Sequence, residues 1–295
     1  MSTAPIKPTA PVDAVIIPHY NDIPRLERCL QALMQNDIAQ TEIVVVDNNS
    51  PVSLDGVRAA YPKVRFIVES EKGAAVARNR GVAETTAQRL FFIDADCIPA
   101  HDWLTVGREI SGRADLIGGR VDVFDETPAP RSGSEAFEAV FAFNFRKYIE
   151  VQGFSGSGNL LTRRDIFDAI GGFINGVSED REWTMRAVAH GYSLIYEDRL
   201  QVSHPSRQDW PALKAKWCRT TREAYQLNGA GLVPRLRWAI RALMMPASAV
   251  VHIPKVLASD KLASPGESAR AIATLIRLRC QRMIWMLQQA FGGPI

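Results

Sequence analysis

The chain has 295 residues, of which 46% are hydrophobic and 23% charged; this is the composition of a folded globular protein and excludes a largely disordered chain. A formal net charge of only +3 gives no argument for a nucleic-acid partner, and the length suits one domain with an ample core or one domain plus a helical segment. Four cysteines lie far apart, with no CxxC pair and no zinc spacing, so we expect reduced thiols: Cys29, Cys97, Cys218 and Cys280.

The N-terminal segment and the absence of a long apolar run bear on targeting. Residues 1–11 are rich in Pro, Thr and Ala and lack the apolar run of a signal peptide, so we expect a disordered leader. No stretch of about 18 uncharged apolar residues is present, which argues against an ordinary membrane-spanning helix. The nearest approach, residues 238–258, is interrupted by Arg241, His252, Lys255 and two prolines.

The first hundred residues alternate short β-branched runs with longer amphipathic stretches. We predict strands at residues 14–17, 43–46, 64–68 and 90–93, separated by helices at 23–35, 54–61 and 73–85. This alternation predicts an α/β fold with a Rossmann-like, mostly parallel central sheet and right-handed crossovers. Ligands of such sheets bind beyond the carboxyl ends of the strands.

Polar residues follow three of these strands. They are Pro18-His19-Tyr20-Asn21, Asp47-Asn48-Asn49-Ser50 and Asp94-Ala95-Asp96. Turn formation or helix capping accounts well enough for Asn48, Asn49 or Ser50 taken singly. It accounts poorly for two carboxylates that flank one alanine directly after a Phe-Phe-Ile strand.

The middle of the chain is mixed, and strand signals stop at about residue 208. We predict a strand at 116–124, a loop at 127–134, one packed helix at 136–151, a glycine-rich turn at 153–158, helices at 164–170 and 179–190, and short strands at 194–197 and 201–203. Helices at 210–228 and 269–291 follow. The predicted domains are therefore residues 12–207, with a nucleotide-binding half at 12–100 and an acceptor half at 101–207, and a basic amphipathic helical region at 208–295.

The acidic motif suits a nucleoside diphosphate and a divalent cation. Hard cations such as Mg²⁺ and Mn²⁺ take oxygen ligands and neutralise a diphosphate leaving group. Residues two apart in an extended chain point the same way, so Asp94 and Asp96 can share one ligand. The pattern itself is common by chance, and its weight here comes from its place after a buried strand.

Neighbouring residues complete a nucleotide site on this interpretation. Asp47 can accept a hydrogen bond from a base N–H, and Tyr20 and Pro18 can form a wall beside the base; packing is an equal explanation for Tyr20. Residues 72–81 begin a helix with small and basic residues, including Arg78, which favours a diphosphate. This stretch is neither a P-loop nor a GxGxxG turn.

Taken in order, these motifs resemble glycosyltransferase family 2 over roughly residues 12–205. The resemblance rests on residues 15–21, 44–50, 73–81, 92–96 and 156–160, on Gly171-Gly172-Phe173 and on Glu179-Asp180. It implies a GT-A fold and a non-processive, inverting sugar transfer from a nucleotide-activated donor.

The resemblance also implies roles for particular residues. Donor binding would fall to Pro18, Tyr20, Asp47 at the base, Arg78 near the phosphates, and Asp94-Ala95-Asp96, with Asp94 at the ribose and Asp96 at the metal. Asp180 would be the catalytic base, and Glu179 would orient the acceptor or the base. From the residues alone, the preferred explanation is that Glu179 and Asp180 simply stabilise the dipole at a helix start. His204 is a candidate second metal ligand, although a lone histidine is more often structural.

The basic amphipathic helices after residue 208 leave two interpretations open. Arginines among large apolar residues can lie in the interface of an anionic membrane. Alternatively, the helices pack on the catalytic domain or on another subunit. We expect a cytoplasmic protein, with peripheral contact to the inner face of the cell membrane on the first interpretation.

The sequence therefore predicts a metal-dependent glycosyltransferase. It would move one sugar from a nucleotide sugar, with a UDP-sugar favoured, to a hydroxyl of a polysaccharide or glycolipid acceptor. A sugar nucleotidyltransferase is the alternative enzyme, but the glycine-rich loop expected after its first strand is absent. A non-catalytic nucleotide-sugar-binding scaffold is the other alternative, and intact Asp94, Asp96 and Asp180 weigh against it.

Overall fold

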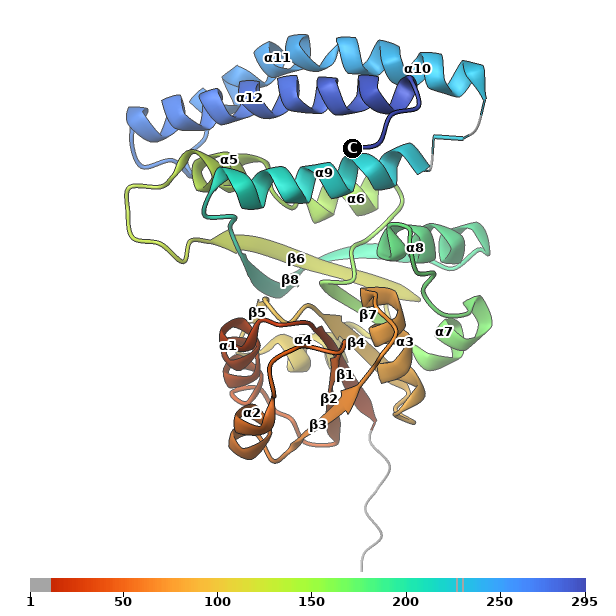
Figure 1. Cartoon of the computed structure of the whole chain (residues 1–295). Helices are drawn as coiled ribbons and strands as arrows, with labels where there is room; N and C mark the ends of the chain where they lie inside the picture. The colour runs from red at the N-terminus through yellow and green to blue at the C-terminus, as the bar shows by residue number, and fades with distance from the viewer. Residues whose placement is uncertain (1–11, 227, 230) are drawn as a thin grey trace, which may run out of the picture. The chain divides into compact units, whose positions relative to one another are not determined.

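The structure is a computed structural model that describes residues 12–226, 228–229 and 231–295 (Figure 1). The predicted leader at 1–11 lies outside the described residues. The chain divides into two compact units. The first comprises the described residues up to Asp122 together with Asn144–His204, and the second comprises Val123–Phe143 and Pro205–Ile295. Residues 123–143, which the sequence placed in the catalytic domain, therefore group with the C-terminal helices.

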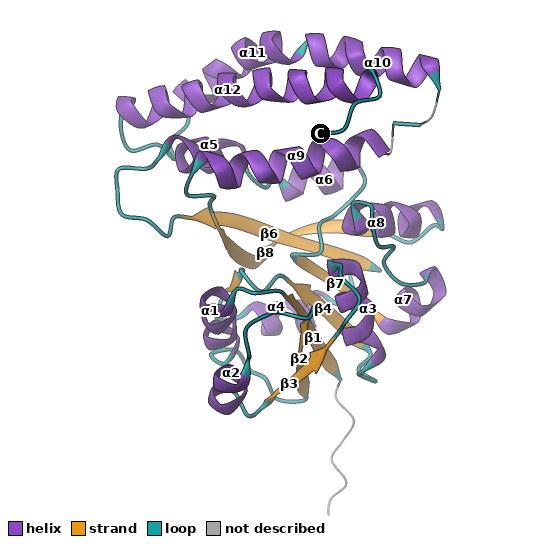
Figure 2. Ribbon diagram, viewed as in Figure 1, coloured by secondary structure: helices purple, strands orange, loops and turns teal. Residues whose placement is uncertain are grey.

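The first unit is built on an eight-stranded sheet in the order β3-β2-β1-β4-β7-β6-β8-β5 (Figure 2). Strands β3, β2, β1 and β4 run parallel, whereas β7 is antiparallel to β4 and β6, and β5 is antiparallel to β8. The strands are β1 (Asp13–His19), β2 (Thr41–Asp47), β3 (Val64–Val68), β4 (Arg89–Ile93), β5 (Ile98–Pro99), β6 (Leu116–Phe124), β7 (Asn159–Arg163) and β8 (Leu194–Pro205). The five strands predicted between residues 14 and 124 are confirmed.

Helices cover both faces of this sheet. They are α1 (Ile23–Leu33), α2 (Asp55–Ala60), α3 (Ala74–Ala83), α4 (Trp103–Ile110), α6 (Phe145–Glu150), α7 (Arg164–Ile170) and α8 (Glu179–Ala189). Because side chains alternate along a strand, Ile16 and Phe92 face a core shared with α3, α7 and α8. Phe91 points the other way and packs on Trp103 of α4, with ring centroids 5.2 Å apart.

The register of the parallel strands brings their carboxyl ends to one edge. Ile16 of β1 is level with Val44 of β2 and with Phe92 of β4. The residues that follow these three strands therefore lie along a common edge, as predicted.

Two predicted elements were wrong in their extent. The single helix predicted at 136–151 is two helices, α5 (Gly133–Phe141) and α6, because Phe143 adopts a left-handed backbone with φ of 44°. Asn144 then starts α6 afresh, since its side chain accepts a hydrogen bond from the Lys147 amide at 3.0 Å. The two short strands predicted at 194–197 and 201–203 form one strand, β8, whose charged residues Asp198 and Arg199 face solvent.

The second unit is helical. Besides α5 it contains α9 (Trp210–Gln226), α10 (Leu232–Leu243), α11 (Met245–Leu257) and α12 (Pro265–Ala290). Helix α12 packs on each of the other four. Phe137, Leu213, Val256 and Leu275 meet in one apolar cluster, which joins α5, α9, α11 and α12.

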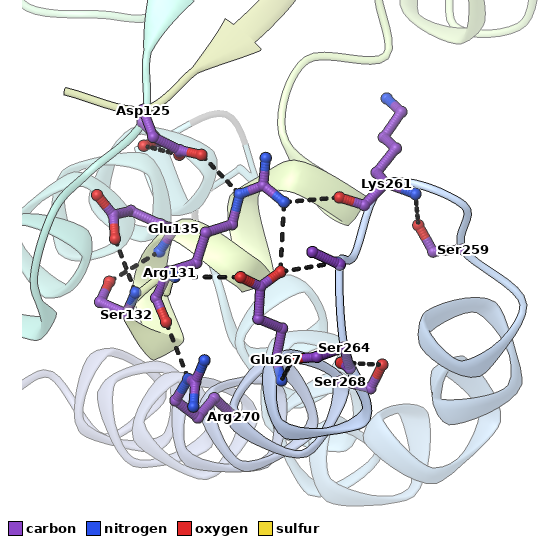
Figure 3. Close-up of polar contacts among 12 residues, drawn as sticks. Asp125, Arg131, Ser132, Glu135, Ser259, Lys261, Ser264, Glu267, Ser268 and Arg270 are labelled. Atoms are coloured by element: carbon purple, nitrogen blue, oxygen red, sulfur yellow. Dashed lines mark hydrogen bonds and ion pairs between the residues drawn. The ribbon is translucent and has the colours of Figure 1, made fainter. Parts of the chain in front are cut away.

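A polar network holds the start of α5 against the start of α12 (Figure 3). Arg131 pairs with Asp125 at 2.6 Å and with Glu267 at 3.4 Å, and its carbonyl accepts from Arg270. Ser132 and Glu135 form a capping box on α5. The buried carboxylate of Glu267 also accepts from the Ala263 amide, and these contacts lower its pKa.

By length and composition, none of the described helices could cross a membrane alone. Helices α10 and α11 pass that test only as a pair, and they are bent by 48° at their junction.

Candidate functional site

A single arginine joins the acidic motif after β4 to the start of α8. The Arg78 guanidinium is 4% exposed; its Nη2 donates to Asp94 Oδ1 at 2.6 Å and its Nη1 to Glu179 Oε1 at 2.8 Å. It also lies over the Phe173 ring, 5.9 Å from the centroid. Burial alone would lower the pKa of Arg78, but the charges of Asp94, Glu179 and Asp180 outweigh it, so the pKa is raised and the group stays cationic. Arg78 thus holds together carboxylates that lie 85 residues apart in the chain (Asp94 to Glu179).

Asp180, the predicted base, lies beside this ion pair in the first turn of α8. Its Oδ1 accepts from the Arg181 amide at 2.6 Å and from the Ser178 hydroxyl at 3.4 Å. Burial and the adjacent charge of Glu179 raise the pKa of Asp180, and Arg78 only partly opposes them. A raised pKa strengthens a carboxylate as a proton acceptor near neutral pH.

The glycine-rich turn before β7 lies against both carboxylates. A Cβ at Gly158 would lie 2.9 Å from Asp94 Oδ2, and one at Gly156 would lie 3.3 Å from Asp180 Oδ2 and 2.8 Å from the Phe145 ring. Only hydrogen fits at these two positions without displacing a neighbour. The turn therefore shapes the space next to Asp94 and Asp180.

Asp96 and His204, the two predicted metal ligands, lie next to each other. His204 Nε2 lies 3.2 Å from Asp96 Oδ2, and the ring is buried at the end of β8. At this distance the two side chains contact each other directly, and ~3 Å is also the separation of adjacent ligands of an octahedral ion with bonds of ~2.1 Å, so both can serve as ligands of one cation. No group of three His, Cys, Asp or Glu side chains suited to a metal occurs among the described residues. Two protein ligands leave positions for phosphate oxygens, the usual arrangement for Mg²⁺ with a nucleotide.

The residues predicted to bind the nucleobase of the donor lie at the ends of β1 and β2. Asp47 is nearly buried and accepts from His19 Nδ1 at 3.1 Å, from the Ser50 hydroxyl at 2.5 Å and from the Ser50 amide at 3.2 Å. His19 Nε2 accepts the Asp22 amide at 3.1 Å, which makes Nδ1 the protonated nitrogen. A carboxylate has about four acceptor positions, so Asp47 retains one for a ligand. Tyr20 is 54% exposed next to this cluster, and its ring is free of the core.

The remaining predicted residues occupy less distinctive places. Pro18 is half-buried within β1, level with Val46 of β2. Ala95 is half-buried between the two aspartates.

Several residues that position the site were not predicted to have a functional role. Asn48 donates to the carbonyls of Glu69 and Glu71 and accepts the Gly73 amide at 2.7 Å, which fixes the loop that leads into α3. Asn79 makes two 2.8 Å hydrogen bonds with the backbone of Phe173. These contacts join segments far apart in the chain, and a local signal could have indicated only that Asn48 follows a strand end.

Two cysteines lie directly beneath the acidic motif. Burial and the charges of Asp96 and Asp94 raise the pKa of both Cys29 and Cys97. The thiols therefore stay protonated and are not nucleophiles at neutral pH.

Comparison with known proteins identifies the family of the chain. Residues 14–171 match the sequence model described as Glycosyl transferase family 2. Glycosyltransferase AglE of Haloferax volcanii is 31% identical over 223 residues, which cover 71% of this chain and 72% of the relative.

Two solved structures share the fold. The mannosyltransferase PcManGT from Pyrobaculum calidifontis, in complex with GDP-Man and Mn²⁺, aligns with a TM-score of 0.61 at 18% identity and covers 96% of this chain and 88% of its own. S. aureus TarS 1–349 in complex with UDP-GlcNAc aligns with a TM-score of 0.55 at 15% identity and covers 95% and 79%. The eight-stranded sheet with its C-terminal helices is thus a GT-A-like fold. The chain belongs to glycosyl transferase family 2 and is a glycosyltransferase.

Proposed function

We propose that this enzyme transfers one sugar, with inversion, from a nucleoside diphosphate sugar to a hydroxyl of a polysaccharide or glycolipid acceptor. The observation that carries the proposal is the convergence on Arg78 of Asp94, from the strand-end motif, and Glu179, the neighbour of Asp180. This arrangement sets a donor-binding carboxylate and a carboxylate of raised pKa on either side of one buried cation.

On the donor side, Asp94 binds the ribose and Asp47 accepts the base N–H at its remaining acceptor position. The exposed Tyr20 ring, with Pro18, forms the wall beside the base, and Ala95 leaves room for the sugar nucleotide. Uridine is the favoured base, and a UDP-sugar is the first donor to test. The nucleotide sugars in the complexes of PcManGT and TarS support a donor of this class.

A divalent cation, Mn²⁺ or Mg²⁺, would be held by Asp96 and His204. When bound, it supplies positive charge that stabilises the departing diphosphate. The 3.2 Å separation of the two side chains and the Mn²⁺ in the PcManGT complex support this assignment.

On the acceptor side, Asp180 takes the proton of the attacking hydroxyl. As that proton leaves, the acceptor oxygen forms a bond to the anomeric carbon of the donor sugar, and the bond from that carbon to the diphosphate oxygen breaks. Attack opposite the leaving group inverts the configuration. Glu179, held by Arg78, keeps α8 oriented and raises the basicity of Asp180 through its charge.

The Asp180→Asn variant tests this mechanism. We expect it to lower kcat by roughly 10²–10⁴-fold, because general-base catalysis contributes about that much. Donor affinity, measured by calorimetry with a UDP-sugar and Mn²⁺, should change little. Asp165→Asn is the matched control, since Asp165 also lies in the first turn of a helix but is exposed. Unchanged transfer by Asp180→Asn would remove Asp180 from the mechanism.

The products separate the alternatives. A glycosyltransferase releases one nucleoside diphosphate for each sugar transferred, whereas a sugar nucleotidyltransferase releases pyrophosphate. Donor binding without either product would favour a non-catalytic scaffold.

A further inference from the structure

Helices α10 and α11 expose large apolar side chains along one continuous face each. On α10 and at the residue that caps it, these recur at helical spacing: Leu232, Val233, Leu236, Ile240, Leu243 and the cap residue Met244. Leu232 is 82% exposed, while Trp238 and Ala242, on the opposite face, are buried against α12. The exposed stripe is therefore no by-product of packing, because the helix already has a separate buried face.

Helix α11 repeats this division. Val250, Val251 and Leu257 are exposed, whereas Ala249 and Val256 are buried in the core of the unit. Helix α10 ends just before Met244 and α11 begins just after it. The two apolar stripes therefore belong to one continuous stretch of chain. Exposed apolar groups that cluster in this way mark an interaction surface.

All ionised side chains of α10 and α11 are positively charged. Between residues 231 and 259 the chain has no Asp or Glu, and its ionised side chains are Arg235, Arg237, Arg241 and Lys255. Arg237 and Arg241 are exposed one turn apart on α10, and Lys255 is exposed on α11. A face of apolar residues with cations at its margin is complementary to an anionic lipid surface.

Further cations lie near the bend. Arg279 of α12 donates to Met245 Sδ at 3.8 Å, and Arg282 lies over the Trp217 ring at 4.6 Å. Burial and the positive charges of Arg279 and Arg241 lower the pKa of Arg282 to about 10, so it remains charged at neutral pH. Among the described residues none of these three arginines forms an ion pair, which leaves a positive potential where α10 meets α11.

Elsewhere in the helical unit, two basic residues make contacts within the unit. Arg277 lies over Trp210 at 4.0 Å, and the buried Lys216 pairs with Glu138 at 2.6 Å. Because the continuous exposed apolar faces described above lie on α10 and α11, the membrane contact predicted for the region after residue 208 is assigned to these two helices.

We propose that α10 and α11 dock this chain onto an anionic lipid bilayer, with their exposed apolar residues in the headgroup region and their arginines on lipid phosphates. A second copy of the chain is a poorer occupant, because a two-fold contact through this face would bring Arg237 and Arg241 close to their own equivalents. The proposal does not depend on the sugar-transfer function.

Flotation with lipid vesicles tests the docking. The full chain, without nucleotide sugar, is mixed with vesicles of phosphatidylcholine alone or with 30% phosphatidylglycerol added, at low and at 0.5 M salt. We expect binding to the anionic vesicles that is much stronger than to the neutral ones and weaker at high salt. The double variant Arg237→Gln/Arg241→Gln should bind roughly 25-fold more weakly, since each cation near such a surface contributes about five-fold.

Val251→Glu and Val151→Glu form a matched pair for the apolar face. Val251 on α11 is 75% exposed and Val151, in the first unit, is 72% exposed. We expect at least a ten-fold loss of vesicle binding for Val251→Glu and none for Val151→Glu, with both variants folded by circular dichroism. Equal binding of Val251→Glu and the wild type would overturn the proposal. So would a wild-type dimer, seen by light scattering, that Val251→Glu makes monomeric.

Discussion

At the scale of single residues, the site is defined by how three carboxylates share one cation. Arg78 pairs with Asp94 and Glu179, and Asp180 is left with a raised pKa beside them. The pKa of Asp180 is therefore higher than 3.8, the ordinary value for aspartate, and the side chain ionises at a correspondingly higher pH. The same shift means that folding disfavours its ionised form, so stability from this residue is present at low pH and is lost as pH rises through the raised pKa.

We expect the acid limb of kcat/KM against pH to have its midpoint clearly above 3.8, because the base must be ionised to accept a proton. Glu179→Gln removes the like charge and should move that midpoint down. The experiment measures initial rates between pH 4 and 8 with saturating metal. A midpoint unchanged by Glu179→Gln would contradict the electrostatic account.

Asp180→Asn should also leave the thermal midpoint of unfolding at pH 7 unchanged or higher, since it removes an ionised group that folding disfavours. Scanning fluorimetry of the variant and of Asp165→Asn checks this. A clear loss of stability would show that the carboxylate supports the fold.

Arg78→Met should lower the free energy of unfolding by about 2–3 kcal/mol. This is somewhat below the usual effect of removing one partner of a buried pair, because the carboxylates stay partly solvated. Urea denaturation at pH 7 measures it. Arg80→Met is the control on the same helix: Arg80 is 47% exposed in its ion pair with Glu84, and a change within about 0.5 kcal/mol is expected.

The acidic residues of the site could be predicted because each has a local marker: Asp47, Asp94 and Asp96 follow strands, and Asp180 begins a helix. The contacts that these residues make with one another and with Arg78 could not be predicted. The contact of Arg78 with Glu179 spans 101 residues, and it depends on how α3 and α8 pack on the same face of the sheet. The link from His19 to Asp47 likewise depends on the turn after β1.

At the scale of elements, the glycine-rich turn before β7 lies against the acidic motif and leaves no room for a side chain at Gly158. Parallel strands of nearly continuous apolar residues made β1 to β4 predictable. Strand β7 was missed because its sequence follows a glycine run, and its identity as a strand comes from pairing with β4 and β6. The break between α5 and α6 was missed because an aromatic residue, Phe143, takes the left-handed conformation that glycine usually supplies.

We expect Gly158→Ala to raise the KM for the donor several-fold with little loss of stability, because a methyl group 2.9 Å from Asp94 Oδ2 displaces that side chain. Steady-state kinetics with varied nucleotide sugar measures the effect. Gly112→Ala is the control, since a Cβ there meets no atom within 4 Å. Equal KM values for the two variants would show that the turn does not constrain Asp94.

At the scale of the whole molecule, the helical unit is assembled from two separate stretches of chain. Residues 123–143 include the last two residues of β6 and all of α5, and the first unit resumes at Asn144. A boundary drawn from sequence at residue 207 could not include them, because α5 joins its unit through contacts with α12, which lies at the far end of the chain. The composition of the sequence indicated only the position, near residue 207, at which predicted strands end.

Binding of a nucleotide sugar should stabilise the whole chain by about 2.7 kcal/mol when the ligand is present at 100 times its Kd. A thermal-shift series with UDP-sugars, with and without Mn²⁺, measures this. His204→Ala should abolish the extra shift due to Mn²⁺, whereas His101→Ala, an exposed histidine, should not. No shift with any nucleotide sugar in the presence of metal would contradict the donor assignment.

The position of Arg78 between Asp94 and Glu179 couples ligand binding at Asp94 to the ionisation of Asp180. A ligand that draws Asp94 away from Arg78 leaves the guanidinium more fully to Glu179 and closer in effect to Asp180, so it favours the ionised base. Such linkage is reciprocal: ionisation of Asp180 must change the affinity for that ligand by the same factor. If Asp94 binds the donor and Asp180 is the base, as proposed, donor affinity would vary with pH around the pKa of Asp180, and Arg78 would couple donor binding to ionisation of the base.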